Sequence, residues 1–340
     1  MTDRTVPTSS PEFFDVFRRQ AGAGAVLPFA DFMDLALYDP AAGYYARRRE
    51  RIGRGPRTDF FTATSLGPVF GELVAAACAA LLGGRAPGAH TFVEIGAEPA
   101  APGGSGGGVL AGVAHRFGAV ATIPLGRPLA IPSSAVVFSN ELFDAQPFHR
   151  VVRRAGRWRE LGVALRAARL EEVELPDLTA SVQAVAERLP AAAPEGYRLD
   201  LPLAAAALAG RIAAQPWTGL FVAFDYGKSW RELAEATPAG TARAYHRHTQ
   251  HDDLLARPGE QDLTCHVCWD WLGAALTAHG FGGPMLESQE AFFVHHAAAS
   301  LRRLTEAEAG RFSDRKLGVM QLLHPGNMGQ KFQVLWARRE

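Results

Sequence analysis

Three short stretches of the sequence place polar side chains directly after apolar runs of strand type. They are Glu94-Ile-Gly-Ala97, Asn140-Glu-Leu-Phe-Asp144 and Asp225-Tyr-Gly227. In open α/β sheets, loops diverge beyond the carboxyl ends of the parallel strands, and ligands bind there. A carboxylate at such an end can orient a basic group, and a glycine turn lets the backbone approach a nucleotide closely. These three strand ends are therefore the candidate site.

A glycine-rich segment follows the first of these strand ends. The apolar strand predicted at 91–95 leads to glycines between Gly103 and Gly108, and a helix is predicted from Val109 to Phe117. This order of strand, glycine turn and helix is typical of nucleotide-binding loops. A flexible surface loop that contains Pro99 and Pro102 would have the same composition. The segment taken alone leaves both interpretations open.

The elements that must position these groups follow an α/β pattern. Short, continuous apolar runs predict buried strands of a mostly parallel sheet covered by helices. The predicted strands are 91–95, 119–125, 135–139, 219–225 and 332–336. The predicted helices are 10–34, 29–37, 68–82, 109–117, 203–215, 268–279 and two within 290–310. Alternation within 151–170 predicts an antiparallel hairpin that turns at Ala155-Gly156, and 226–262 is predicted to be a loop.

The predicted elements divide the chain into four segments. Residues 1–60 form an N-terminal helical and loop extension, and 61–150 form the first part of an α/β domain. Residues 151–215 form an inserted hairpin and helix. Residues 216–340 complete the α/β domain with C-terminal helices and a last strand.

Composition excludes several classes of function. The chain has 35 basic and 35 acidic side chains, so it has no overall field that would gather nucleic acid or an anionic membrane. Three cysteines are too few for a disulfide framework, which favours a reducing compartment. The N-terminal residues are acidic and resemble no targeting segment. We expect a soluble, cytoplasmic protein that binds neither nucleic acid nor membranes.

Eight stretches, in order along nearly the whole chain, resemble the MidA-like family of mitochondrial complex I assembly methyltransferases and their bacterial relatives. They are Phe32-Met-Asp-Leu-Ala-Leu-Tyr-Asp-Pro-Ala-Ala-Gly-Tyr-Tyr45, Asp59-Phe-Phe-Thr-Ala63, Pro68-Val-Phe-Gly71, Glu94-Ile-Gly-Ala97, Ser139-Asn-Glu-Leu-Phe-Asp-Ala-Gln-Pro147, Asp225-Tyr-Gly227, Pro258-Gly-Glu-Gln-Asp-Leu-Thr264 and Met328-Gly-Gln-Lys-Phe332. Eight matches in sequence are far more specific than any one of them.

The resemblance implies a class I methyltransferase-like, Rossmann-type α/β fold with an N-terminal helical extension and additional hairpin and helical segments. It also implies S-adenosyl-L-methionine (SAM) as the cofactor and methyl transfer to a protein arginine. The partner would be a protein substrate that presents an arginine. A homodimer is one arrangement that the sequence leaves open.

The same resemblance implies which residues contact the cofactor. They are Glu94, Gly96, Gly106, Gly108 and Asn140. SAM carries no phosphate, so the glycine loop needs close backbone approach and not an anion-binding helix end.

The second strand end supplies the residues that the resemblance implies for catalysis. Glu141 and Asp144 would orient the guanidinium, because carboxylates pair with that group in a bidentate manner. Asp225 and Tyr226 would line the substrate side. The competing interpretation is structural: Asp144 caps the next turn, Glu141 faces solvent, and Asp225 accepts hydrogen bonds from nearby backbone amides.

Two departures from the family pattern support a second hypothesis. The compact glycine turn of the family is split here by Glu98-Pro-Ala-Ala-Pro-Gly-Gly-Ser105, and no Asp or Glu lies between Glu98 and Glu141. Such sites hold the ribose with a carboxylate about 20 residues beyond the glycines. The alternative is therefore a degenerate, non-catalytic member of the fold that acts as a binding or assembly module. We favour the enzyme.

Histidines and cysteines in the second half of the chain raise the question of a zinc site. His246, His248 and His251 lie near Cys265-His-Val-Cys268, and cysteines with histidines can form a tetrahedral zinc site. One C-x-x-C pair is only half of a zinc signature. We therefore expect ordinary packing at a helix start and predict no metal ligands.

Overall fold

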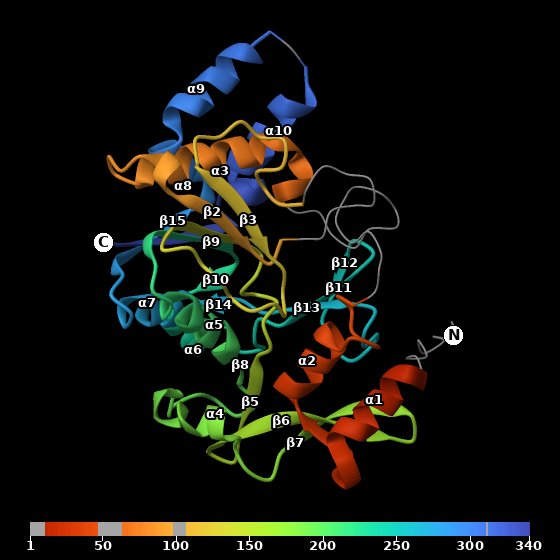
Figure 1. Cartoon of the computed structure of the whole chain (residues 1–340). Coiled ribbons are helices and arrows are strands. Elements are labelled where there is room, and N and C mark those ends of the chain that lie inside the picture. The colour runs from red at the N-terminus through yellow and green to blue at the C-terminus, as the bar shows by residue number, and fades with distance from the viewer. Residues whose placement is uncertain (1–10, 47–62, 98–106, 311) are drawn as a thin grey trace. The chain divides into compact units, whose positions relative to one another are not determined.

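The computed structural model describes residues 11–46, 63–97, 107–310 and 312–340 of the chain (Figure 1). The chain forms two compact units, each assembled from separate stretches. Unit 1 comprises residues 1–60, 144–206 and 228–268, and unit 2 comprises residues 61–143, 207–227 and 269–340. Within the described ranges, no helix combines the length and the apolar character needed to cross a bilayer.

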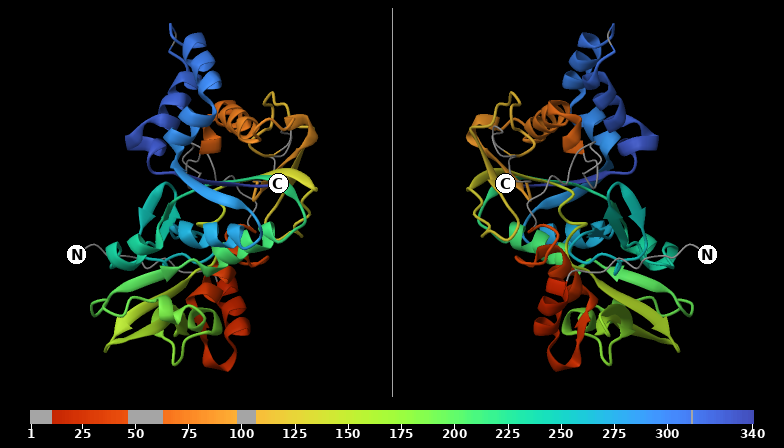
Figure 2. Two further views of the ribbon diagram at one scale, coloured as in Figure 1. Left: turned by 90° about the vertical axis from the view of Figure 1, so that its left-hand side faces the viewer. Right: turned by 90° about the vertical axis from the view of Figure 1, so that its right-hand side faces the viewer.

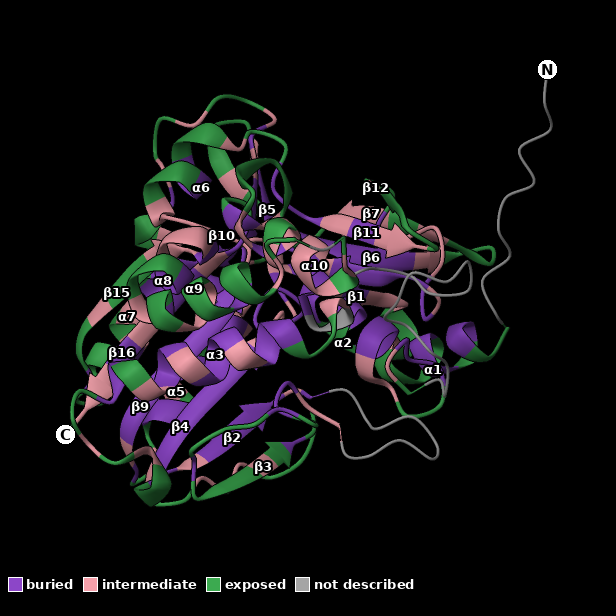
Figure 3. Cartoon of the chain, turned by 90° about the horizontal axis from the view of Figure 1, so that it is seen from above, coloured by how far each residue is buried: buried purple, intermediate pink, exposed green. Residues whose placement is uncertain are grey.

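Unit 2 is built on a six-stranded mixed sheet in the order β15-β16-β9-β4-β2-β3. Its strands are β2 (Thr91–Ile95), β3 (Ala119–Ile123), β4 (Ser134–Asn140), β9 (Thr218–Asp225), β15 (Gly282–Ser288) and β16 (Gln333–Arg339). Strands β3, β2, β4 and β9 are parallel, whereas β16 is antiparallel to both β9 and β15. Figure 3 shows β9, β4 and β2 buried along most of their length, which explains why their sequences are continuous apolar runs.

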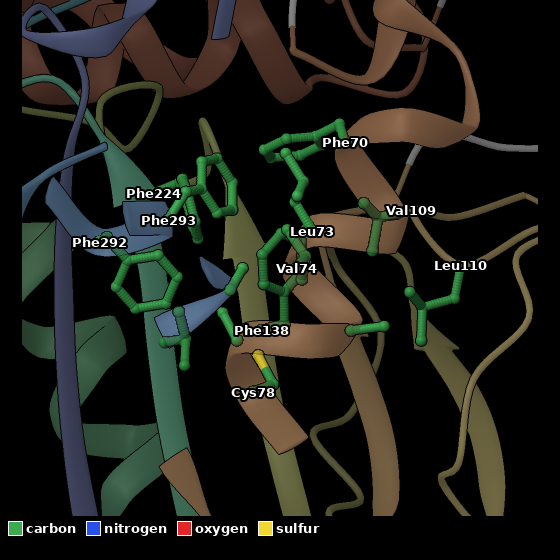
Figure 4. Packing of buried hydrophobic residues seen from close by; sticks show 14 of the residues in the cluster. Phe70, Leu73, Val74, Cys78, Val109, Leu110, Phe138, Phe224, Phe292 and Phe293 are labelled. Atoms are coloured by element: carbon green, nitrogen blue, oxygen red, sulfur yellow. The ribbon is translucent and has the colours of Figure 1, made fainter. Parts of the chain in front are cut away.

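Helices cover both faces of this sheet. They are α3 (Pro68–Leu81), α7 (Trp269–Thr277), α8 (Gln289–His296), α9 (Ala298–Ala307) and α10 (Asp314–Leu323), with short turns at η2 (Ala63–Leu66), η3 (Pro87–Ala89) and the π-helical η5 (Pro325–Gly329). The views in Figure 2 place α3 and α8 to α10 on one face and α7 on the other. On the first face, Phe70 of α3 packs against Phe138, Phe224 and Phe293 (Figure 4).

The predicted strands of unit 2 are confirmed, but one predicted helix was wrong and two observed elements were not predicted. Residues 109–117 form turns and irregular backbone where a helix was predicted. β15 was not predicted, because its Gly282-Gly283-Pro284 start is typical of a loop; as an edge strand it tolerates proline. α10 was also not predicted, although Ser313 caps it by accepting from Lys316 N at 3.1 Å.

Unit 1 contains an antiparallel sheet in the order β1-β6-β5-β8, with β7 also paired to β6. Its strands are β1 (Val26–Pro28), β5 (His149–Arg154), β6 (Arg157–Arg166), β7 (Arg169–Glu174) and β8 (Arg198–Leu201). The predicted hairpin is confirmed. Its turn residues Ala155 and Gly156 have φ values of 46° and 72°, the two positive values that a tight hairpin turn requires.

Helices α1 (Pro11–Ala21) and α2 (Phe29–Tyr38) pack their phenylalanines into the core of unit 1. The helical run predicted over 10–34 is wrong in its extent. α1 ends at Ala21, the η1 turn (Gly22–Gly24) follows, and Ala25 adopts a left-handed φ of 47° before β1. Two glycines in three residues stop the helix, because glycine is a poor helix former.

The loop predicted over 226–262 is wrong, because this part of the chain is ordered into short elements. They are β10 (Gly227–Lys228), α6 (Trp230–Ala236), β11 (Arg243–His246) and β12 (Thr249–His251), followed by β13 (Asp262–Thr264) and β14 (Val267–Cys268). Ser229 and Glu232 form a reciprocal capping box at the start of α6, a signal that is present in the sequence. The remaining elements are α4 (Ala180–Gln183), η4 (Ala186–Arg188) and α5 (Leu203–Ala213).

Candidate functional site

The candidate site lies in unit 2, at the carboxyl ends of β2 and β4. These strands are adjacent and parallel, with Glu94 opposite Phe138 in the register. β3 lies on the other side of β2, so the order of the chain reverses between β2 and β4. Ligands of doubly wound sheets bind at such a reversal. Gly96 and Asn140 therefore lie at the edge of the sheet where a cofactor is expected.

Gly96 makes a turn that a larger residue would disturb. Its φ is +80°, and its N–H donates to the Ile123 carbonyl at 2.9 Å. A Cβ added at this position would lie 2.9 Å from Leu142 Cδ1. The turn after β2 therefore passes close to the segment after β4, and only glycine fits without displacement.

Glu94 joins the end of β2 to the far end of the glycine loop. Its side chain is buried, and its Oε2 accepts from Val109 N at 2.6 Å. Burial raises the pKa of Glu94 to about 7, against the opposing effect of the Val109 hydrogen bond. Gly108 has a φ of +112°, and a Cβ there would lie 2.8 Å from Glu94 Oε2. The carboxyl group thus holds the loop end in place.

Asn140 and Glu141 form the end of β4. Asn140 Nδ2 donates to Glu141 Oε1 at 3.0 Å, and Asn140 Oδ1 is buried without a hydrogen-bond partner among the described residues. Glu141 adopts a left-handed φ of 50°, and its N–H donates to the Phe224 carbonyl at 2.9 Å. Non-glycine residues in this conformation are strained and cluster at functional sites. The buried Asn140 oxygen is an acceptor that a ligand could use.

Asp225 and Tyr226 follow at the end of β9, beside β4. Asp225 is fully buried, and its carboxylate accepts from Phe143 N at 2.9 Å and from Tyr226 N at 2.8 Å. The Tyr226 ring packs on Phe332 with a centroid distance of 4.0 Å. Asp225 therefore organises the backbone at this strand end, which agrees with the structural interpretation of this residue.

The end of β3 differs from its neighbours. The strand ends at Ile123 and continues as a turn through Pro124 and Leu125, closed by Arg127 N donating to the Pro124 carbonyl at 3.3 Å. These residues carry no carboxylate. The strand end from which a ribose would usually be bound supplies no acid here.

Two predicted site residues fall outside this description of unit 2. Gly106 lies outside the described residues. Asp144 belongs to unit 1, where it is buried and its backbone carbonyl accepts from Cys265 N at 3.0 Å. Cys265 and Cys268 are both buried in unit 1. Sequence reasoning missed Leu142 and Val109, whose roles depend on approach between distant segments and have no local signal.

Comparisons with known proteins point to SAM chemistry. Residues 121–282 match the family described as "Putative S-adenosyl-L-methionine-dependent methyltransferase". The matched region includes the ends of β3, β4 and β9 but begins after the glycine loop. A search of the curated proteins found no match.

Two solved structures resemble the chain over almost its full length. A COG1565 superfamily protein from Burkholderia thailandensis bound to S-adenosyl-homocysteine is 26% identical, with a TM-score of 0.82 over 98% of this chain and 95% of that chain. The native crystal structure of a COG1565 superfamily protein from the same organism is 26% identical, with a TM-score of 0.80 and the same coverage.

Proposed function

We propose that this chain is a SAM-dependent methyltransferase whose cofactor site lies at the ends of β2 and β4. The observation that carries the proposal is the full-length likeness to a protein bound to S-adenosyl-homocysteine, the product that SAM becomes when it gives up its methyl group. The family match over residues 121–282 supports the same chemistry.

The topology of unit 2 supports a class I, Rossmann-type assignment. The doubly wound order 3-2-1-4-5-6 places a ligand where the strand order reverses. In unit 2, β2 takes the first place in that order, β3 the second, β4 the fourth and β9 the fifth. Among the described residues, no strand pairs with the outer side of β3, and the interval between Gly108 and β4 is short. Antiparallel β16 and then β15 complete the other side.

The residues at this edge fit a nucleoside-type cofactor. Gly96 and Gly108 keep Cβ atoms out of the turn, so the backbone can lie close to a ligand. The buried Asn140 Oδ1 can accept a hydrogen bond from a ligand amino or hydroxyl group. Glu94 holds the far end of the loop through Val109 N. When bound, SAM would supply a methyl group activated by its sulfonium.

The substrate that we propose is a protein arginine, as in MidA-like proteins. Glu141 would hold the guanidinium by charge-assisted hydrogen bonds and take up the proton that the methylated nitrogen loses. The Asn140 hydrogen bond to Glu141 Oε1 orients that carboxylate. Asp144 remains the second proposed carboxylate, and the two side chains are best tested separately because they belong to different units.

A non-catalytic binding module is the second candidate. The end of β3 carries no carboxylate for the ribose, and residues 109–117 lack the helix that usually supports the glycine turn. A missing hydrogen bond to a charged group costs about 1.5 to 3 kcal/mol, or roughly tenfold to hundredfold in affinity. Such a loss weakens cofactor binding without removing the fold.

Calorimetric titration of SAM and S-adenosyl-homocysteine into the purified chain tests the cofactor site. We expect micromolar binding that Asn140→Ala weakens about tenfold, since one buried hydrogen bond is removed. Asn327→Ala, an exposed residue of the same type in unit 2, is the matched control. Absence of heat with millimolar cofactor would refute the cofactor site.

Mass spectrometry tests the substrate. The chain, SAM and arginine-containing peptides should give a methylated product that is absent when lysine replaces arginine. Intact cofactor binding without any methylated peptide would favour the non-catalytic module.

A further inference from the structure

A second cluster of side chains, which methyl transfer does not use, lies at β15, the outermost strand of the sheet in unit 2. Glu287 on β15 accepts from both histidines at the end of α8. The distance from His295 Nδ1 to Glu287 Oε1 is 2.5 Å, and that from His296 Nε2 to Glu287 Oε2 is 2.8 Å. One donor atom from each residue lies within 4.8 Å of those of the other two.

The local fold holds this cluster together. α8 begins directly after β15, with Ser288 as its cap, so strand and helix form one continuous corner. On the neighbouring strand, Trp336 Nε1 donates to Glu287 Oε2 at 2.8 Å. The His296 ring packs against Trp336 at 5.4 Å between centroids. The carboxylate and one imidazole are thus oriented by a second layer of contacts, as metal ligands usually are.

The donor set is that of a zinc site. Two imidazole nitrogens and one carboxylate oxygen are the protein ligands of known three-ligand Zn²⁺ sites that leave a fourth position open. Zn–N and Zn–O bonds of about 2.0 to 2.1 Å place tetrahedral ligands roughly 3.3 Å apart. The three donor atoms lie within 4.8 Å of one another, so small side-chain movements would bring them to this spacing.

The exposure of the cluster suits binding from solution. The His295 side chain is 59% exposed, whereas those of His296 and Glu287 are 20% and 14% exposed. Two ligands are therefore held in place while the third borders solvent, which provides an entry path. The cluster is distinct from the cofactor edge, since β16 and β9 separate β15 from β4 (Figure 3).

We propose that Glu287, His295 and His296 form a Zn²⁺ site that ties the edge strand β15 to α8. Binding replaces the hydrogen bonds to the carboxylate: each neutral imidazole carries its one proton on the ring nitrogen that faces away from the ion, and the other ring nitrogen offers its lone pair. The ion would stabilise this corner of unit 2, because it binds the folded chain and has no preformed site in the unfolded one.

Calorimetry with Zn²⁺ alone, added to the chelator-treated full chain, tests the proposal. We expect one equivalent to bind, with affinity reduced at least tenfold in His296→Gln and in Glu287→Gln. Trp336→Phe removes only the N–H that orients the carboxylate and should weaken binding about tenfold. His279→Gln, an exposed histidine of unit 2, is the matched control and should bind like the wild type.

Two further readouts separate a metal site from a purely hydrogen-bonded cluster. Zn²⁺ should raise the melting temperature of the wild type but not that of His296→Gln. Co²⁺ in place of Zn²⁺ should give the visible absorption of a low-coordinate site. If Glu287→Gln does not fold, the exposed His295→Asn replaces it. Equal zinc binding by the wild type and the His295 and His296 variants, or no binding at all, would overturn the proposal.

Discussion

The ends of β2 and β3 are neighbours in one sheet, yet they are built differently. At the end of β2, a positive-φ glycine, a buried carboxyl group and a loop residue are joined by short contacts. At the end of β3, an exposed proline and an exposed leucine lead into a simple turn without an acid. The end of β2 is therefore held in a defined conformation by several contacts, whereas the end of β3 is a simple exposed turn.

In the cofactor site that we propose, this difference separates a contribution of shape from a contribution of charge. The contacts around Gly96 and Glu94 allow close backbone approach, which depends on shape. The missing carboxylate at β3 would remove a charge-assisted hydrogen bond, which depends on one side chain. Weak but specific binding of SAM is the outcome expected of such a site.

The Glu94→Gln substitution should have the largest effect on the free energy of unfolding, and at high pH the effect is a gain. Its pKa is raised from 4.5 to about 7, so the folded chain holds a proton that the unfolded chain loses between these pH values. Stability therefore falls as pH rises through this window, by about 3 kcal/mol in total. Glu94→Gln stays neutral and should exceed the wild type by up to that amount at pH 8 but little at pH 4.5.

Urea denaturation of both proteins at several pH values measures this difference. The exposed Glu306→Gln is the charge-matched control. A constant difference between Glu94→Gln and the wild type from pH 4.5 to 8 would show that the buried carboxyl is not the titrating group.

Gly108→Ala should have the second largest effect on the free energy of unfolding. The new Cβ meets Glu94 Oε2 at 2.8 Å, and alanine is strained at a φ of +112°. We expect a loss of about 2 to 3 kcal/mol. Gly112→Ala, at a φ of +70° with open space around it, should lose only about 1 kcal/mol in the same denaturation experiment. Equal losses at the two glycines would contradict the close approach to Glu94.

Restoring an acid at the end of β3 should strengthen the binding of SAM. Leu125 is 37% exposed and follows the strand by two residues. If the missing carboxylate limits affinity, Leu125→Asp should bind SAM about tenfold more tightly, or about 1.4 kcal/mol, in calorimetry. Leu125→Asn has the same shape without the charge and should change affinity little. Equal effects of Asp and Asn would mean that charge is not the missing element.

The smallest effect on the free energy of unfolding is expected for substitutions of Glu141. Glycine accepts its φ of 50° without strain, so Glu141→Gly should gain about 0.5 kcal/mol after the entropy cost of glycine is deducted. Glu141→Gln keeps the backbone and should leave stability unchanged while it lowers methyl transfer. A loss of stability in Glu141→Gly would mean that side-chain contacts outweigh the strain.

Local patterns predicted most of the regular elements. β2 was predicted residue for residue, because a strand buried on both faces is mostly apolar, and in β2 only Thr91 and Glu94 depart from this pattern. The hairpin of β5 and β6 was predicted because alternation and an Ala-Gly turn agree. The helix predicted at 109–117 was wrong for a tertiary reason. Val109 N donates to Glu94, and Gly71 of α3 passes so close to the Val109 carbonyl that no Cβ would fit between them.

The sequence by itself determined which strands are buried, where the glycine turn lies and that the end of β3 has no acid, because each of these depends on residue type and spacing along the chain. Only the tertiary structure decided that Glu94 holds the end of the glycine loop and that Glu287 meets two histidines. Burial sets the pKa of a carboxyl group, and packing chooses its partners; neither can be read from neighbours in sequence.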